Sequence, residues 1–442
     1  MGRDRAETIM DFKKNHKWQN WAQTLQFQPD LFCQPETVED VVNVVKDART
    51  KKKCIRVQGA EHSHSWSQFV ATNGVLVSLD NLAKPLIADI LKNRYTVQAG
   101  VRIKDLVQIL AKDGLGLKNT GSIMEQSIAG ATATGTHGTG LSLGNLATQI
   151  VGMKIVTGTG DVKTIDETDM NTLRSARVNF GALGIVVEVT LDCVKNYDLE
   201  FSAYWCELDD VLDKIDVLNH ENDRVRVWWT PKPLFGMKHD TIISTMNTPG
   251  TPRGILKDFE NLTSGQESRL AHNSLPLDLD VLFTMLQEIA GDPNRKVLLS
   301  RYTANYVQVL TLPLLPILHR ECEYAIPAEH AREALVHLRT VMQEGDFGTT
   351  LPVEVRFVAK DDTLLSPASG RDVCYIGVNT MNNANEIFQR WEPLMKSLQG
   401  RPHWGKHFTM TRKEMEDISI PDTPSSPPSG LPGIRTTCLP IH

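Results

Sequence analysis

Hydrophobic residues recur along the first half of the chain in two periods, which predict a mixture of helices and strands. Valines at 41, 42, 44 and 45 form one stripe in segment 35–50, and this spacing predicts a helix. Segment 103–112 carries a second helical pattern. Continuous or alternating apolar runs predict strands at 54–58, 75–79, 95–99, 149–157 and 188–191. Because helices and strands do not alternate as a clean βαβ repeat, the pattern indicates an α+β fold rather than a doubly wound sheet.

The pattern changes near residue 196. Strands are predicted at 226–229, 321–326 and 352–359, and an acid-rich helical stretch at 280–290. These elements favour a second α+β domain centred on an antiparallel sheet, so we expect domains at 18–195 and 196–410. The remaining segment, 411–442, contains the Pro/Ser/Gly stretch PDTPSSPPSGLPG. Such a stretch cannot bury enough apolar surface to fold alone, and it predicts a disordered tail.

Composition narrows the class of protein. A chain of 442 residues is too long for one compact core. A net charge of −6 argues against a nucleic-acid binder. Seven scattered cysteines without a CxxC motif are typical of reduced thiols inside a cell. With no secretory signal and no apolar run long enough to span a bilayer, we expect a cytoplasmic protein without a transmembrane segment.

Two loops of small residues indicate an anion-binding site. The loop Gly59-Ala60-Glu61-His62-Ser63-His64 follows a predicted buried strand, where successive backbone N–H groups can converge on an anion. The segment 120–140, TGSIMEQSIAGATATGTHGTG, adds glycines that allow close backbone approach and hydroxyls that bind phosphate. The segment has no GK[ST] motif, which excludes a Walker-type loop. No GxGxxG motif opens a helix after a first strand, which argues against a Rossmann site. A pyrophosphate is the expected ligand, although each loop taken alone is compatible with a simple turn.

His62 and His64 leave a metal site open as an alternative. Alternate residues after a strand face the same way, so an HxH pair can ligate a metal in a hydrolase. Such an enzyme needs further His and Asp ligands at later strand ends, in repeated βα units that the pattern lacks. His137 is the only other histidine of the Gly/Thr-rich region. We therefore expect no metal.

A third motif places charge on a strand. Glu354 and Arg356 are two residues apart in the apolar run 352–359, so they point to the same face of the strand. Such a pair is often a surface salt bridge. The apolar surroundings indicate instead that this face turns inward, where an unpaired charge is costly.

These loops resemble a known family. GAEHSHS at 59–65 and GSIMEQSIAGATATGTHGTG at 121–140 look like the FAD-binding domain of vanillyl-alcohol-oxidase-type flavoproteins, and within it the sugar-1,4-lactone and alditol oxidase branch. Shorter motifs continue the resemblance in order to about residue 408: WQNWA at 18–22, GALG at 181–184, RVWW at 226–229, ECEY at 321–324, EVRF at 354–357 and HWGK at 403–406. The resemblance implies a two-subdomain FAD-binding domain followed by an α+β substrate domain.

The resemblance also implies cofactor contacts. FAD is expected, bonded covalently through His62, with a noncovalent flavin as the alternative. Gly59, Ala60, Glu61, Ser63 and His64 are expected to bind the pyrophosphate. The segment 121–137 is expected to border the pyrophosphate and the flavin ring through Gly121, Ser122, Ser127, Gly130, Thr134, Gly135 and His137. Ile185 and Val186 are expected to hold the adenosine end.

On the substrate side, the resemblance implies hydride transfer from a hydroxyl-bearing carbon of a sugar lactone or alditol. Lys406 is expected to lie beside Glu354 and Arg356. Arg356 and Lys406 are expected to stabilise the developing alkoxide, with Lys406 as a candidate base. Glu354 is expected to orient substrate hydroxyls, and His403 to shape the pocket wall. Molecular oxygen is the expected final acceptor, giving hydrogen peroxide. Two alternatives stay open: an inactive flavin-binding scaffold, because the tail departs from the family after Phe408, and the metal-dependent hydrolase.

Overall fold

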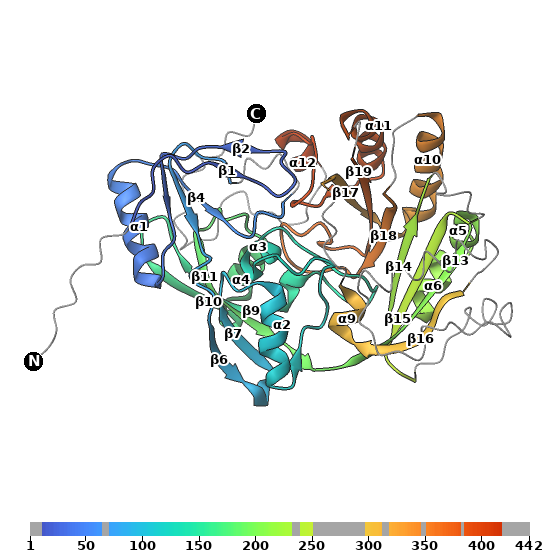
Figure 1. The fold of residues 1–442 in the computed structure, drawn as a ribbon, viewed down its shortest axis with the longest axis horizontal. Coiled ribbons are helices and arrows are strands. Elements are labelled where there is room, and N and C mark those ends of the chain that lie inside the picture. Colours follow the sequence, from blue (N-terminus) through green and yellow to red (C-terminus); the bar gives the residue numbers. More distant parts are fainter. Residues whose placement is uncertain are drawn as a thin grey trace, which may run out of the picture.

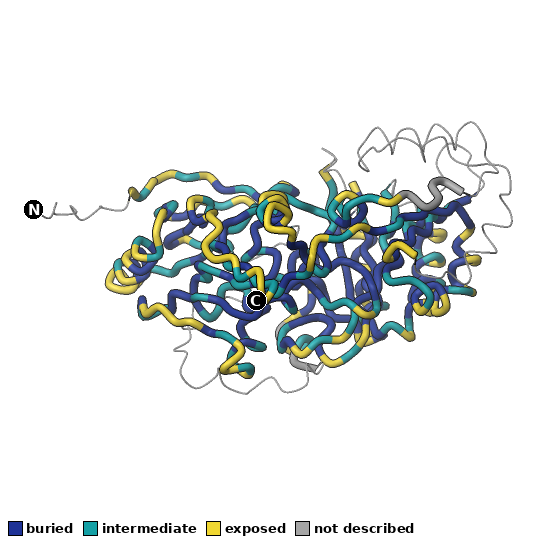
Figure 2. The backbone as a smooth tube through the Cα atoms, turned by 90° about the horizontal axis from the view of Figure 1, so that it is seen from below, coloured by how far each residue is buried: buried dark blue, intermediate teal, exposed yellow. Residues whose placement is uncertain are grey.

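The structure is a computed structural model that describes residues 11–63, 70–231, 239–250, 297–311, 318–345, 351–381 and 384–417. Two halves lie side by side, one built from the first half of the chain and one mainly from the second (Figure 1). Buried segments run through the interior of both halves, while exposed segments lie at the rim (Figure 2). None of the helices within these ranges is long and apolar enough to cross a membrane.

A small parallel sheet carries the first glycine loop. Its strands are arranged β3-β5-β4, with bounds Leu31–Cys33, Val75–Ser78 and Ile55–Gln58. Helix α1 (Val38–Thr50) connects β3 to β4, and its buried side chains are four valines and Ala48. Thr37 begins the helix with a capping box, in which its hydroxyl accepts from Asp40 N and Asp40 accepts from Thr37 N. Strand β4 ends at Gln58, so the loop that begins at Gly59 directly follows a strand of this sheet.

A five-stranded antiparallel sheet forms the rest of the first half. Its order is β10-β9-β11-β7-β6, with bounds Val162–Asp166, Ile150–Val156, Ile185–Asp192, Arg94–Gln98 and Pro85–Asp89. Three helices accompany it: α2 (Ile103–Lys112), α3 (Ile128–Ala133) and α4 (Met170–Arg177). Two minor pairs complete this half: β1 (Trp18–Gln19) with β2 (Gln26–Phe27), and β8 (Leu115–Gly116) with β12 (Val194–Lys195).

The second half is built on an eight-stranded sheet whose named pairs are all antiparallel. Its order is β16-β13-β15-β14-β18-β19-β17-β20, with bounds Val297–Asn305, Asp198–Cys206, Thr241–Asn247, Arg224–Trp229, Val353–Val358, Val373–Thr380, Arg320–Pro327 and Arg401–Pro402. The helices of this half are α5 (Leu208–Leu212), α6 (Ile215–Glu221), α9 (Tyr306–Leu310), α10 (Ala331–Glu344), α11 (Ala384–Ser397) and α12 (Arg412–Asp417).

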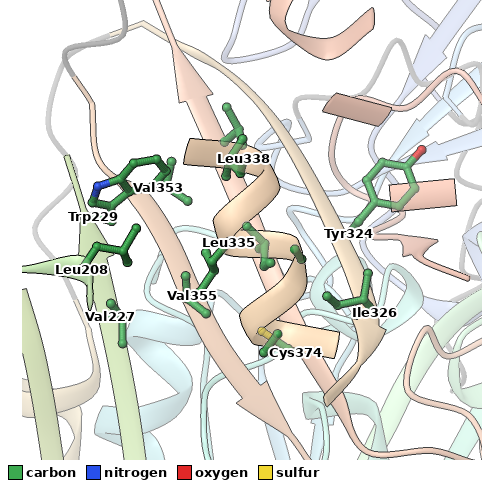
Figure 3. Close-up of a cluster of buried hydrophobic side chains, with 14 of the residues drawn as sticks. Leu208, Val227, Trp229, Tyr324, Ile326, Leu335, Leu338, Val353, Val355 and Cys374 are labelled. Atoms are coloured by element: carbon green, nitrogen blue, oxygen red, sulfur yellow. The ribbon is translucent and has the colours of Figure 1, made fainter. Parts of the chain in front are cut away.

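Alternation along the central strands gives this sheet two different faces. Val225, Val227 and Trp229 of β14, with the matching residues of β17, β18 and β19, pack with residues of α5, α6, α10 and α11 in the largest core. Figure 3 shows part of this core, where Leu335 and Leu338 of α10 lie among side chains of the sheet. The residues between them share the other face, because side chains alternate along a strand. On that face lie Arg226, Glu354, Arg356, Glu321 and Glu323. The sheet therefore presents charged side chains on the side opposite the helices.

The two halves share an apolar core and a backbone connection. Leu199, Phe201 and Trp205 of β13 pack in the same core as Val97 of β7 and Leu106 of α2. The Gly/Thr segment of the first half also reaches the second sheet. There Gly140 N donates to Phe357 O (2.6 Å), and the Thr139 hydroxyl contacts both Val225 O and Phe357 N. The loop expected to hold a cofactor is thus joined to the strand that carries Glu354 and Arg356.

Most of the elements expected from the sequence are confirmed, with boundary shifts of a few residues. Helix 103–112 is reproduced in full, and the strands at 54–58, 75–79, 95–99, 149–157, 226–229, 321–326 and 352–359 are present. The parallel unit β3-α1-β4 was not expected, because β3 has only three residues and carries little periodic signal. The helix expected at 280–290 lies outside the described residues.

The expectation of a disordered tail from residue 411 is wrong at its start. Residues 412–417 form α12, and Thr411 and Glu414 begin it with reciprocal bonds between their side chains and backbones. Glu414 also pairs with Lys396 of α11 (2.9 Å), and Met415 packs against the main core. Residues 418–442 lie outside the described ranges.

Candidate functional site

A groove between the two halves collects many of the residues singled out in the sequence. It contains about 1700 Å³ of empty space, including space open to solvent. One wall comes from the loop after β4, helix α3 and the start of β11, and the other from β17 and the turn after β20. Gly59, Ala60, Glu61, His62, Ser63, Ser127, Gly130, Thr134, Ile185, Val186, His403 and Lys406 all line it.

Other expected residues do not line the groove. Gly121, Ser122, Gly135 and His137 are not among its lining residues, and neither are the strand residues Glu354 and Arg356. His64 falls outside the described residues. The roles expected for these residues stay predictions.

Several lining residues carried no assigned role in the sequence. Trp18, Asn20 and Trp21 belong to the WQNWA motif, and Glu321 to the ECEY motif, so the signal was present but pointed to no chemistry. The signal in ECEY is the same as in EVRF: two charged residues spaced two apart in an apolar strand. Asn179, Phe180 and His319 also line the groove and had no comparable signal.

The glycine-lined part of the groove is shaped for a ligand that approaches the backbone. A Cβ on Gly59 would lie 2.7 Å from Ser127 Oγ, and a Cβ on Gly130 would lie 2.9 Å from the same atom. Side chains at these two positions would therefore fill the space between the loop and helix α3. Glu61 adopts φ 63°, a left-handed conformation that is uncommon outside glycine and that also occurs in anion-binding backbone nests. These features match the narrow, phosphate-bearing middle of a dinucleotide.

His62 lies in the same groove, 5.9 Å from Trp21 between ring centroids. Burial lowers the pKa of His62, an effect that Glu125 opposes. A neutral imidazole keeps a lone pair and can act as a nucleophile. The position is therefore chemically suited to the covalent bond expected from the sequence.

The groove also contains a charged pair. Lys406 forms an ion pair with Glu321, and both side chains are largely buried, with exposed fractions of 18% and 8%. The expected neighbour of Lys406 was Arg356. The guanidinium of Arg356 instead contacts Glu323 (2.8 Å), Glu354 (3.4 Å) and the carbonyl of His137 (3.3 Å).

On the charged face of the eight-stranded sheet, side chains of alternating charge form a row that we call the charge ladder. Arg226 contacts Glu354 (3.4 Å), Glu354 contacts Arg356, and Arg356 contacts Glu323. Although burial alone would raise it, the charge of Arg356 holds the pKa of Glu323 well below its ordinary value. Because each buried charge has a partner of opposite sign, the inward-facing strand pair does not leave an uncompensated charge.

His137, Glu323 and His403 bring candidate ligand atoms within 4.8 Å of one another, and all three are buried. The contacts that these atoms already make argue against a cation site. Nδ1 of His403 accepts the N–H of Gly405 (3.0 Å), so the neutral ring carries its proton on Nε2 and offers no free lone pair. Glu323 Oε1 is already 2.8 Å from the Arg356 guanidinium. Burial lowers the pKa of His403 to about 3, which keeps this ring neutral near pH 7.

His137 contacts both the Gly/Thr segment and the charged face of the sheet. Its Nδ1 donates to Gly138 O (3.0 Å), while its Nε2 lies 3.3 Å from Glu323 Oε1. A hydrogen bond between these last two atoms requires a proton on one of them. Its ring also stacks on Tyr375 with centroids 3.5 Å apart. His137 thus anchors the Gly/Thr segment to the charged face of the sheet.

Comparisons with known proteins identify the family and the fold. A family model described as D-arabinono-1,4-lactone oxidase matches residues 189–423, and one described as an FAD binding domain matches residues 29–166. The first match continues past Phe408, where the resemblance was expected to end.

Two relatives match nearly the whole chain in sequence. L-gulono-1,4-lactone dehydrogenase of Mycobacterium tuberculosis is 31% identical over 409 residues, covering 90% of this chain and 92% of the relative. L-gulonolactone oxidase of Bos taurus is 30% identical over 419 residues, covering 92% of each. Among solved structures, the His121Ala mutant of cholesterol oxidase from Brevibacterium sterolicum covers 95% of this chain and 93% of its own, with a TM-score of 0.72 at 15% identity. That structural likeness confirms the expected flavoprotein fold.

Proposed function

This chain belongs to the D-arabinono-1,4-lactone oxidase family of oxidoreductases, and from that premise we propose that it oxidises a hydroxyl-bearing carbon of a sugar 1,4-lactone or related polyol. The observation that carries the proposal is the groove, which joins a backbone-lined cradle at Gly59 and Gly130 to the charged pair of Lys406 and Glu321. The names of the two relatives support a lactone as substrate.

FAD would occupy the groove and would be held by residues around the cradle at Gly59 and Gly130. The loop 59–63 and Ser127 of α3 would bind its pyrophosphate, and Ile185 and Val186 its adenosine end. When bound, FAD supplies the acceptor for the hydride. The chain's own residues would orient the lactone, exclude water and stabilise the oxygen that loses its proton.

Lys406 is the cation best suited to that oxygen. Its ammonium lines the groove, whereas Arg356 is not among the lining residues and pairs with Glu323. Positive charge aimed at an oxygen that becomes negative in the transition state lowers the barrier strongly, because the stabilisation grows as the negative charge develops. Arg356 and Glu354 would then not touch the substrate. Arg356 would instead help to hold β17, which carries Glu321, through its contact with Glu323, and Glu354 would pair with Arg356.

The experiment is anaerobic reduction of the flavin-loaded protein by a panel of lactones and alditols, followed in the visible spectrum. Bleaching by a 1,4-lactone is the expected result. Bound flavin that no compound reduces would favour the inactive scaffold. Adding oxygen or an artificial acceptor to the reduced protein then separates oxidase from dehydrogenase, because only the oxidase releases peroxide rapidly. We propose the oxidase.

Covalent attachment through His62 has its own test. His62→Ala is expected to lose all flavin that stays with the acid-precipitated protein, because the substitution removes the imidazole nucleophile. His319→Ala is the matched control, since His319 lines the same groove and also contacts Trp21, with ring centroids 5.4 Å apart. Acid-resistant flavin in the His62 variant would show that the attachment site is elsewhere.

A further inference from the structure

Glu321 is a groove residue to which the sequence assigned no chemistry. It lies near the start of β17, on the charged face of the eight-stranded sheet, and lines the groove beside Lys406. The two side chains form an ion pair although 85 positions separate them in the sequence. This pair is a charged feature of the groove that a substrate hydroxyl could contact.

The backbone fixes the positions of both partners. His407 N donates to Glu321 O (2.8 Å), and Cys322 and His407 form an isolated parallel bridge, so the segment bearing Lys406 is held alongside β17. On the neighbouring strand, Gly377 leaves room for the carboxylate. A Cβ at Gly377 would lie 3.2 Å from Glu321 Oε1, tighter than an ordinary contact. Glycine at this position therefore leaves the space that the Glu321 carboxylate occupies beside Lys406.

Oxidation of a hydroxyl-bearing carbon needs a group that accepts the hydroxyl proton. His403 cannot serve, because its Nδ1 already accepts from Gly405 and its Nε2 carries the proton. Lys406, paired with a carboxylate, is an ammonium that donates hydrogen bonds and has no lone pair. His62 is assigned above to the flavin, and His319 stands edge-on to Trp21.

We propose that Glu321 is the catalytic residue that accepts the hydroxyl proton, while the ammonium of Lys406 holds the substrate oxygen. This inference rests on the proposed function. In the step, the O–H proton passes to a carboxylate oxygen of Glu321, which becomes a carboxylic acid. The C–H hydrogen leaves with its electron pair to oxidised FAD, and the electrons of the O–H bond form the second bond of the new carbonyl. Two electrons thus leave the substrate and two reduce the flavin.

The decisive variant is Glu321→Gln in the flavin-loaded protein. Glutamine has the same size and can still accept a hydrogen bond from Lys406, but it cannot take up the proton. We expect the anaerobic rate of flavin reduction to fall about 10²–10⁴-fold at every pH, with lactone affinity changed only a few-fold. If Lys406 were the base, loss of the carboxylate would favour its neutral amine. The rate would then reach the same plateau as in the wild type, but it would reach that plateau at a lower pH. That result would overturn the proposal.

Two further variants make the result specific. Glu188→Gln removes a carboxylate that pairs with Lys154 (2.7 Å) outside the groove, and it is expected to leave the rate unchanged. Glu321→Asp keeps a carboxylate on a shorter side chain and is expected to be at least about tenfold faster than Glu321→Gln. Equal rates for the two variants at position 321 would overturn the proposal.

A second readout does not depend on turnover. The infrared difference spectrum between the resting wild-type protein and Glu321→Gln at pH 7 reports the protonation state of Glu321. An ionised carboxylate is expected, because Lys406 forms an ion pair with it. A protonated carboxyl would overturn the assignment. A wild-type protein that no lactone reduces would refute the proposed function itself, whereas an active wild type with an equally active Glu321→Gln would refute only the role of Glu321.

Discussion

Replacing Arg356 by methionine tests whether the charge ladder holds the site together. Arg356 is 6% exposed and contacts Glu323, which is 1% exposed. Methionine fills much of the same volume but leaves the Glu323 carboxylate buried without its main cation. Removing one partner of a buried ion pair costs about 3–5 kcal/mol. Glu354 is affected less, because it keeps its contact with Arg226.

The measurement is the free energy of unfolding from urea titration, followed by tryptophan fluorescence. Arg356→Met is expected to lose about 3–5 kcal/mol at pH 7. The loss should shrink in acid. In the wild type, the low pKa of Glu323 contributes stability that is present above the ordinary glutamate pKa and disappears as the pH falls through the folded-state value.

A double variant and a surface control separate charge from packing. Arg356→Met with Glu323→Met removes both charges, and it is expected to recover most of the loss, because apolar replacement of a whole buried pair is often neutral. Arg332→Met breaks an exposed pair with Asp213 (3.3 Å) and should cost about 0–1 kcal/mol. A loss below about 1 kcal/mol in Arg356→Met, or a double variant as unstable as the two single variants combined, would refute the reasoning.

Two further predictions concern the backbone and pH. Gly184 has φ 139°, and a Cβ there would lie 2.5 Å from Val156 O, so Gly184→Ala should cost more than about 1 kcal/mol and weaken flavin retention, measured by urea unfolding and by the flavin-to-protein absorbance ratio. An alanine variant as stable as the wild type would contradict this. Burial raises the pKa of Asp361 to about 6 from 3.8, although it accepts from Asn145 and Ser366. The folded protein therefore binds a proton that the unfolded chain releases between these values, and stability should fall by about 3 kcal/mol as the pH rises through them. Asp361→Asn should flatten this part of the curve of melting temperature against pH, and an unchanged slope would exclude Asp361 as its cause.

Local structure and the cofactor loops were predictable from the sequence, because their signals are short-range. Helix 103–112 follows from one apolar stripe, and the strand before Gly59 from a run of five residues. The glycine-rich segment indicated backbone contact with a phosphate, since glycine removes side chains wherever it occurs. The pairing of Glu354 and Arg356 on an inward face also followed from a period of two.

Tertiary structure alone decided which charges meet. The sequence placed Lys406 beside Arg356, but the sheet order β18-β19-β17-β20 brings β17 next to the turn that carries Lys406. Lys406 therefore pairs with Glu321, and Arg356 with Glu323. Strand order depends on contacts between segments far apart in the chain, and the local pattern of apolar residues does not predict those contacts. The sequence by itself thus determined which residues face inward, and only packing between distant strands determined which partner each of them has.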